Sequence, residues 1–264
     1  MLCAFGLTEA QAGSDITNIQ TTAVKEDGHY VLNGIKQFIS SGSHADVYVV
    51  LASTDKSRGA RGISAFIVEK DTPGFSFGKK ENKLGIRAAI TTELVFEECK
   101  IPKEALMGKE GMGFIYTMRN FDRARPGVGA IALGIAQGAY EAALEFAYNK
   151  NILNNQYIQR IIADMATEVE AARALLYATA RMIDAGSKNF TKEASFAKLY
   201  PSDIAVKVTS QALELLGPYG LLREYRVEKM LRDAKITQIY EGTNQIQRAQ
   251  IAIELTREMG SRER

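Results

Sequence analysis

The sequence predicts an α+β protein, in which an N-terminal β-barrel or β-sandwich domain (residues 1–112) precedes an antiparallel four-helix bundle (residues 113–264). Short runs of β-branched and aromatic residues, separated by turn-forming glycines, fill the first part and predict strands. Long segments with apolar residues every three or four positions fill the second part and predict helices.

The strands are predicted from turn chemistry and composition. Asp27-Gly28 and Asn33-Gly34 favour the positive φ angles of two-residue hairpin turns, so a strand is expected on each side of both. Turns are also expected at Arg61-Gly62 and Pro73-Gly74. Further strands are expected at residues 47–52, 63–69 and 93–98.

The helices are predicted at residues 127–148, 157–185, 191–216 and from 244 toward 258. In the first, closely spaced Gly and Ala predict close helix contacts. Gly186 is expected to cap the second helix and Thr191 to cap the third, which Gly217 and Pro218 should stop.

Composition excludes several classes of function. Thirty-three basic and thirty-one acidic residues give a net charge of +2, so nucleic acid and anionic membranes are not expected as partners. Cys3 and Cys99 lie far apart and only two histidines are present, so neither a disulfide nor a metal site is expected. Cys99 is expected to be a small buried side chain. No apolar run approaches the ~20 residues of a membrane span, and the start does not resemble a signal peptide.

Two segments of the β region could bind a ligand. In Phe5–Asp15, FGLTEAQAGSD, glycines and hydroxyl side chains could approach a planar ring or a phosphate. The alternative is that this segment is an ordinary loop that leads into a strand. In Lys36–Gly42, KQFISSG, Phe38 and Ser40 should face the same side of a strand and could contact one ligand. The alternative is that Phe38 lies in the core.

A third segment, RDAKITQIYEGTNQIQR (Arg232–Arg248), contains a candidate base. Glu241 follows an apolar run and precedes Gly242, where the chain should bend before the last helix. A carboxylate in such an apolar place should have a raised pKa, which suits a general base. Alternatively, Glu241 is a solvated residue near a helix N-terminus, where a negative charge is favourable.

These segments, together with NFDRARPGVGA (Asn120–Ala130), resemble signature segments of the acyl-CoA dehydrogenases, in the same order over nearly the whole chain. The resemblance implies a middle β domain and a C-terminal helical domain, without the family's N-terminal helical domain. It also implies FAD-dependent α,β-dehydrogenation of an acyl-CoA in fatty acid metabolism, by a homotetramer in the bacterial cytoplasm or the mitochondrial matrix. Electrons would pass to an electron-transfer flavoprotein, or to oxygen in an oxidase.

The resemblance also implies residue roles, with Glu241 as the base that removes the α proton. FAD would contact Phe5, Leu7, Thr8, Gly13, Ser14, Phe38, Ser40, Thr243 and Gln245. The acyl-CoA substrate would contact Ser14, Phe121, Asp122, Arg125, Tyr240 and Gly242. From the residues alone, Arg125 ahead of Pro126 could equally be an exposed charge at a helix start.

The chain departs from the family pattern at two places besides the missing N-terminal domain. The stretch FAYNKNILNNQYIQRII is about five residues shorter than the usual one, which carries an Arg and a Phe that reach the FAD of a neighbouring subunit. Glu214 and Pro218 replace residues that handle the FAD diphosphate. Either the sequence lacks parts of a longer enzyme, or the protein is a non-catalytic partner subunit that has lost tight FAD binding.

Overall fold

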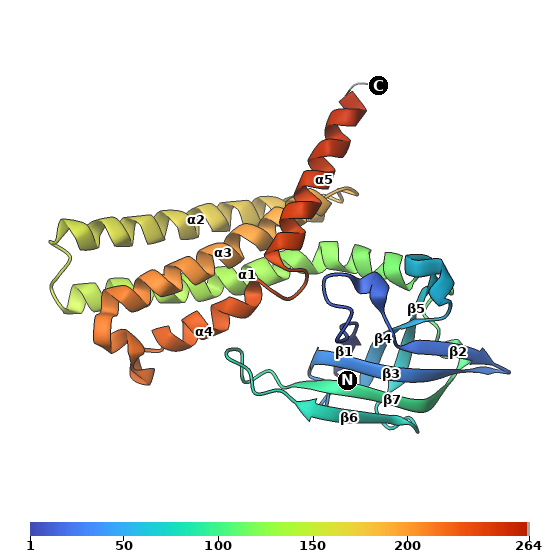
Figure 1. Cartoon of the computed structure of the whole chain (residues 1–264). Coiled ribbons are helices and arrows are strands. Elements are labelled where there is room, and N and C mark those ends of the chain that lie inside the picture. The colour runs from blue at the N-terminus through green and yellow to red at the C-terminus, as the bar shows by residue number, and fades with distance from the viewer. Residues whose placement is uncertain (263–264) are drawn as a thin grey trace. The chain divides into compact units, whose positions relative to one another are not determined.

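The computed structural model describes residues 1–262 and divides the chain into two compact units. The first, the β unit, comprises residues 1–83 and 87–119. The second, the helical unit, comprises residues 84–86 and 120–264. The predicted α+β class is confirmed: a curled sheet comes first in the chain and a helical domain follows (Figure 1).

The β unit is built on one seven-stranded sheet with the order β1-β4-β2-β3-β7-β6, and β5 also pairs with β4. Most neighbouring strands are antiparallel, whereas β1 and the first residue of β2, Thr22, pair with β4 in parallel. The aromatic and β-branched side chains of one face form the core, which includes Cys99, buried as expected. The strands are β1 (Cys3–Gly6), β2 (Thr22–Glu26), β3 (His29–Ser40), β4 (Val47–Ser53), β5 (Ile63–Glu69), β6 (Phe75–Lys80) and β7 (Thr91–Pro102).

The two predicted hairpin turns have different outcomes. Asp27-Gly28 forms the β2–β3 turn, with Glu26 opposite His29 and a φ of 79° at Gly28. The prediction for Asn33-Gly34 is wrong, because β3 continues through it and its pairing with β7 only shifts register there. Gly34 has a φ of 147°, and an added Cβ would lie 2.5 Å from Thr21 Oγ1. The glycine therefore serves a β-bulge under close packing rather than a turn.

The helical unit contains three long helices and two shorter ones in its described part. Consecutive long helices run antiparallel, and α3 also packs against α4 and α5 (Figure 1). Gly186, with a φ of 81°, ends α2, and Gly217, with a φ of 58°, ends α3, as predicted. The helices are α1 (Gly113–Asn149), α2 (Gln156–Asp184), α3 (Thr191–Leu216), α4 (Val227–Thr237) and α5 (Asn244–Arg262).

Three helix predictions need correction. The first helix begins at Gly113 rather than near 127, since α1 continues through Pro126. Thr191 does not cap α3: its hydroxyl donates to Asp122 instead, 2.7 Å away. The third correction is α4, which the sequence analysis does not predict as a separate helix, because its short amphipathic run overlaps the motif around Glu241.

By length and composition alone, α1 is apolar enough to cross a membrane. Its apolar side chains nevertheless have a packing role, since Ala132, Ala136, Ala139 and Ala143 are fully buried in the core of the helical unit. A core helix of a globular protein passes the same length and composition test. Packing within the helical unit therefore accounts for part of the apolar character of α1, since 39% of its most apolar stretch is buried.

A substitution at Gly129 can test the close contact between α1 and α3. An added Cβ would lie 1.9 Å from the Ala197 carbonyl oxygen, so Gly129→Ala should destabilise the helical unit by about 1–3 kcal/mol or more. Gly134→Ala on the same helix is the matched control. No atom lies within 4 Å of its added Cβ, and the variant should be stabilised by about 0.5–1 kcal/mol. Thermal unfolding of both variants measures the difference, and equal melting temperatures would contradict the contact.

Candidate active site

Glu241 lies in a tight bend between α4 and α5, as predicted. Glu241 and Gly242 have positive φ angles, 56° and 89°. The Asn244 amide closes the bend by donating to the Gln238 carbonyl oxygen, 2.9 Å away. Position 242 requires glycine for two reasons. Its φ angle is positive, and an added Cβ would lie 2.7 Å from Gln247 Nε2. A positive φ at a glutamate is strained, and such strain is often found at functional sites.

The Glu241 carboxylate is partly buried, and its Oε2 atom is buried without a hydrogen-bond partner among the described residues. Burial raises the pKa of Glu241, and the positive charges of Arg125 and Lys198 only partly oppose this. The predicted direction of the pKa shift is confirmed, and the alternative of a solvated residue is wrong. An unpaired buried carboxylate is a candidate proton acceptor.

Arg125 provides one of the two positive charges near Glu241. It lies inside α1, only 5% exposed, so an exposed charge at a helix start is the wrong interpretation. Its Nη1 donates to Asp122 Oδ1 over 2.9 Å and lies 3.4 Å from Ser195 Oγ. The Nε atom of Arg125 is buried without a partner among the described residues. Burial lowers the pKa of Arg125, against the effect of Asp122 and Glu241.

The other residues predicted around Glu241 differ in their exposure. Phe121 and Tyr240 are half-buried, and burial together with the charge of Glu241 raises the pKa of Tyr240. Thr243 accepts a hydrogen bond from the Ile246 amide at the start of α5, 3.3 Å away, and therefore has a structural role. Gln245 is exposed.

Three buried polar residues that the sequence analysis missed hold the bend. Lys198 of α3 donates to the Gly242 carbonyl oxygen over 2.8 Å and to Asn244 Oδ1 over 2.7 Å. Gln247, fully buried, donates to the carbonyl oxygens of Glu241 and Gly242 over 3.1 and 3.0 Å. The position of Lys198 among the apolar residues of its helix was the available signal for this network.

The β unit brings its two predicted segments together. The Gln37 amide of β3 donates to the Thr8 carbonyl oxygen over 2.7 Å, which places the loop after β1 beside Phe38. Phe38 has a φ of 58° and is 60% exposed, so the alternative of a core residue is wrong. Ser40 is also exposed, whereas Ile39 between them is buried. A register shift against β7 between Lys36 and Ile39 accompanies this arrangement.

A buried ion pair, also missed from the sequence, joins these two segments. Lys36 Nζ lies 2.6 Å from Glu9 Oε1, and both side chains are almost completely buried. Lys36 also donates to the Leu7 carbonyl oxygen over 3.2 Å, and Glu9 accepts from the amides of Gln20 and Thr21. Burial lowers the pKa of Lys36 to about 8 although Glu9 opposes this. The pKa of Glu9 is lowered, because Lys36 and these hydrogen bonds outweigh the effect of burial.

The residues of the β unit fit the ring end of a flavin. Phe38 offers an exposed aromatic face, and Thr8, Ser14 and Ser40 offer hydroxyl groups on accessible backbone. No atom lies within 4 Å of a Cβ added at Gly13, which leaves room for a ligand there. Leu7 is buried and Phe5 is partly buried.

The end of α3 does not fit a diphosphate. Glu214 is exposed there and carries a negative charge, and Pro218 lacks an amide hydrogen. Between α1 and α2 the chain closes compactly, with the Ile152 amide donating to the Ala147 carbonyl oxygen and Asn155 capping α2. The shortened connection is therefore a regular structure, without the Arg and Phe that the resemblance implied.

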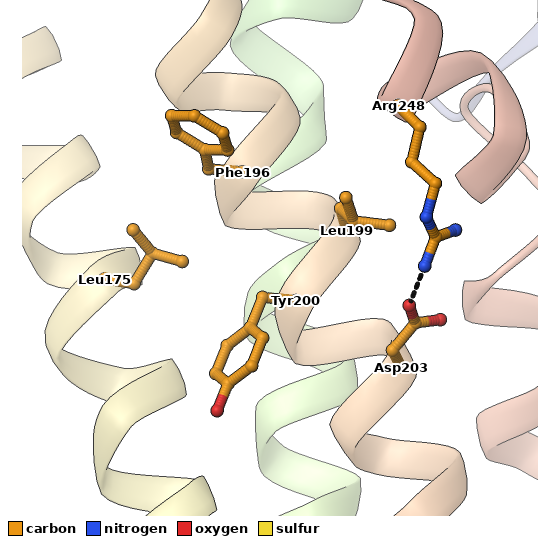
Figure 2. A pocket seen from close by; sticks show the side chains of 6 residues that line it. All are labelled: Leu175, Phe196, Leu199, Tyr200, Asp203 and Arg248. Carbon is orange, nitrogen blue, oxygen red and sulfur yellow. Dashed lines mark hydrogen bonds and ion pairs between the residues drawn. The ribbon is translucent and has the colours of Figure 1, made fainter. Parts of the chain in front are cut away.

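An open pocket of the helical unit lies beside the bend, where Asp203 and Arg248 form part of its lining. It has a volume of about 390 Å³ and is lined by residues of α2, α3 and α5 (Figure 2). Within it, Arg248 Nη2 lies 2.6 Å from Asp203 Oδ2. The other oxygen of Asp203 accepts from Asn244 and Gln238, 2.7 Å from each, so the ion pair continues into the network of the bend. No cluster of metal-ligating side chains occurs in residues 1–262.

Comparisons with known proteins agree with this architecture. Residues 4–99 match the acyl-CoA dehydrogenase middle domain, and residues 111–256 match the acyl-CoA dehydrogenase C-terminal domain. An acyl-CoA dehydrogenase of Bacillus subtilis is 50% identical over 252 residues, which cover 94% of this chain and 66% of that protein. The chain thus spans just under two thirds of this relative.

Solved structures give the same result. A chain in the structure of the electron transferring flavoprotein of Acidaminococcus fermentans superposes with a TM-score of 0.94 at 50% identity, covering 96% of this chain and 68% of that one. Butyryl-CoA dehydrogenase from Megasphaera elsdenii superposes with a TM-score of 0.93 at 47% identity and the same coverage. Solved relatives include FAD-dependent members. The chain therefore belongs to the acyl-CoA dehydrogenase family and contains its middle and C-terminal domains.

Proposed function

We propose that this chain carries out FAD-dependent α,β-dehydrogenation of an acyl-CoA thioester, with Glu241 as the base that removes the α proton. The observation that carries the proposal is the buried Oε2 atom of Glu241, which has no partner among the described residues, in a bend whose backbone is strained. The raised pKa of Glu241 makes its carboxylate a stronger base than an exposed one. Membership of the acyl-CoA dehydrogenase family supports acyl-CoA thioesters as the substrate class.

The residues around Glu241 would share the binding of the substrate. Its carboxylate accepts the proton from carbon 2, while its backbone N–H donates to the thioester carbonyl oxygen, on which negative charge develops. Phe121, Asp122 and Arg125 contact the CoA portion, and Tyr240 and Gly242 border the acyl group. Arg125 has the positive charge that a phosphate-bearing ligand requires, and its free Nε atom is still available to donate.

FAD, when bound, supplies the acceptor for the hydride that leaves the β carbon. Phe38, Ser40 and the loop after β1, including Phe5, Leu7, Thr8, Gly13 and Ser14, would hold the flavin ring. Thr243 and Gln245 would also contact FAD. We further propose that the reduced protein passes its electrons to an electron-transfer flavoprotein and works as a homotetramer. Exposed apolar residues of α5 support assembly: Ile253, Leu255 and Met259.

Anaerobic titration of the FAD-reconstituted protein with a series of straight-chain and branched acyl-CoAs tests the function. Bleaching of the flavin absorbance by at least one of them, with formation of the corresponding 2-enoyl-CoA, is the expected result. Exchange of the α protons in D₂O, followed by NMR, tests the base separately from the hydride transfer. The proposal fails if FAD binds and no acyl-CoA either reduces it or exchanges its α protons.

A second function, a non-catalytic partner subunit, is favoured by Glu214 and Pro218 at the end of α3 and by the short connection after α1. These features would weaken FAD binding while leaving the fold intact. A colourless protein that does not take up added FAD, and that assembles only with an FAD-bearing family member, would establish this function instead. Uptake of one FAD per chain by the protein alone would contradict it.

A further inference from the structure

A lysine lies buried directly beneath the bend that carries Glu241. Lys198 belongs to α3 and is completely buried, yet its ammonium group contacts no carboxylate within salt-bridge distance among the described residues. Its hydrogen bonds go instead to the Gly242 carbonyl oxygen and to Asn244 Oδ1. A buried charge without an ion-pair partner is costly, so a purely structural lysine would be an inefficient choice here.

The second partner of Lys198 is itself fixed from the other side. Asn244 Nδ2 donates to Ser202 Oγ over 2.9 Å and to Asp203 Oδ1 over 2.7 Å. Since Ser202 and Asp203 lie on α3 together with Lys198, one helix holds the side chain of Asn244 at three points. Asp203 also accepts from Gln238 at the beginning of the bend, so both ends of the bend are tied to α3.

The first partner of Lys198 lies one residue after the base. The Gly242 carbonyl oxygen accepts from both Lys198 and Gln247, which fixes the orientation of the peptide group that follows Gly242. Gln247 also holds the Glu241 carbonyl oxygen. With these carbonyl groups fixed, the positive φ angles of Glu241 and Gly242 have little freedom to relax.

The charges that surround the base come from α1, α3 and the bend itself. The charges of Arg125 of α1 and Lys198 of α3 act on the Glu241 carboxylate. Arg125 pairs with Asp122, and the charge of Asp203 acts on Lys198. Tyr240 neighbours the base in the bend. Burial lowers the pKa of Lys198 to about 8, with Arg125 acting in the same direction and Asp203 and Glu241 acting against it. Lys198 is therefore still mostly charged at neutral pH.

We propose that Lys198 is a positioning residue for Glu241: its ammonium group fixes the Gly242 carbonyl and Asn244, and so holds the base in its strained conformation and provides a nearby positive charge. This inference rests on the proposed function for its catalytic meaning. Its structural part, the rigidity of residues 238–247, can be measured whether or not the protein turns over substrate.

Two substitutions separate the two roles of the lysine. Lys198→Met removes both the hydrogen bonds and the charge, while Lys198→Gln removes the charge and keeps an N–H donor on a side chain one atom shorter. Lys207→Met is the matched control, since Lys207 lies on the same helix with a half-exposed side chain and pairs with Glu168 rather than with the bend. Hydrogen exchange measured by mass spectrometry reports on residues 238–247, and the pH profile of α-proton exchange reports on the base.

In Lys198→Met, the amide hydrogens of residues 238–247 should exchange at least about tenfold faster than in the wild-type protein, because hydrogen bonds from a charged donor are lost. Lys198→Gln should show a smaller increase. In both variants the acidic limb of the pH profile should move to higher pH, since one cation that favours the Glu241 carboxylate is gone. Lys207→Met should leave both measurements unchanged.

The inference is wrong if both Lys198 variants show the same amide exchange rates in residues 238–247 as the wild-type protein. It is also wrong if both variants keep the pH profile of the wild-type protein. If Lys198→Met does not fold, Lys198→Gln decides by the same two measurements. Failure of the proposed function looks different: the wild-type protein would then not exchange α protons at all. In that case the amide exchange of residues 238–247 alone would decide whether Lys198 holds the bend.

Discussion

Glu241→Gln should reduce α-proton exchange and flavin reduction by about 10²–10⁴-fold, the usual contribution of a positioned general base. The amide has nearly the shape of the carboxylate, so the bend and its hydrogen bonds to Gln247 and Lys198 should persist. Binding of acyl-CoA should change little, because the backbone N–H of residue 241 is kept. Stopped-flow absorbance measures flavin reduction, and NMR in D₂O measures exchange.

Glu254→Gln is the control, since Glu254 is another α5-side carboxylate that pairs with Arg257 on its own helix. Its rate should equal that of the wild-type protein. A Glu241→Gln variant that retains more than about a tenth of the wild-type exchange rate would assign the base to another group.

The pH dependence follows from the direction of the pKa shift. Burial raises the pKa of Glu241 in the folded protein, so the active carboxylate form is lost as pH falls through that raised pKa. The acidic limb of the rate profile should therefore lie above the pH at which an ordinary glutamate titrates. If the limb coincides with that of an exposed glutamate, the base is not in a buried environment.

The same shift has a cost in stability. Between the unfolded and the raised folded pKa, the unfolded chain releases the proton of Glu241 first, so the stability contributed by this group falls as pH rises. At neutral pH, Glu241→Gln should therefore be at least as stable as the wild-type protein. Loss of activity without loss of stability distinguishes a functional residue from a structural one.

The second large effect is expected at the buried ion pair of the β unit. Lys36→Met should destabilise this unit by about 3–5 kcal/mol, because it leaves the Glu9 carboxylate buried without its countercharge. The Leu7 carbonyl oxygen loses a donor as well, so the loop after β1 should become more mobile. Urea-dependent hydrogen exchange, read at strands β3 and β7 and at residues 5–15, measures both effects.

Two further variants test the cause of this loss. Glu9→Gln combined with Lys36→Met removes both charges and should recover a large part of the stability. Lys79→Met breaks an exposed ion pair with Glu81 and should cost less than about 1 kcal/mol. Equal losses in Lys36→Met and Lys79→Met would show that the buried pair contributes no more than a surface one.

The difference in the free energy of unfolding between Lys36→Met and the wild-type protein should become smaller at low pH. In the wild-type protein the pKa of Glu9 is lowered, so the stability that its carboxylate contributes is lost as pH falls through that value. In the variant, burial acts on Glu9 without the opposing charge, and protonation relieves the cost. Both effects reduce the gap at low pH.

The sequence by itself determined the class of fold, the bend at Glu241 and the raised pKa of its carboxylate. Local signals sufficed for these: β-branched and aromatic runs bounded by turn residues, apolar residues with a period of 3.6, glycines that accept positive φ, and an apolar run before an acid. The same local signals failed at Asn33-Gly34 and at Pro126. The dipeptide fits a bulge as well as a turn, and a helix held by tertiary contacts can continue through a proline.

Only the tertiary structure decided how the charges are paired. Lys36 meets Glu9 across 27 positions of the chain, and Lys198 meets Gly242 across 44, so no local pattern could have connected them. Each lysine is buried because the segments packed around it exclude water. The cost of burying its charge is offset only because the same segments supply hydrogen-bond acceptors for the ammonium group. The proposed base, Glu241, could be singled out from its neighbours in sequence, whereas Lys198, which contacts its bend, comes from another helix.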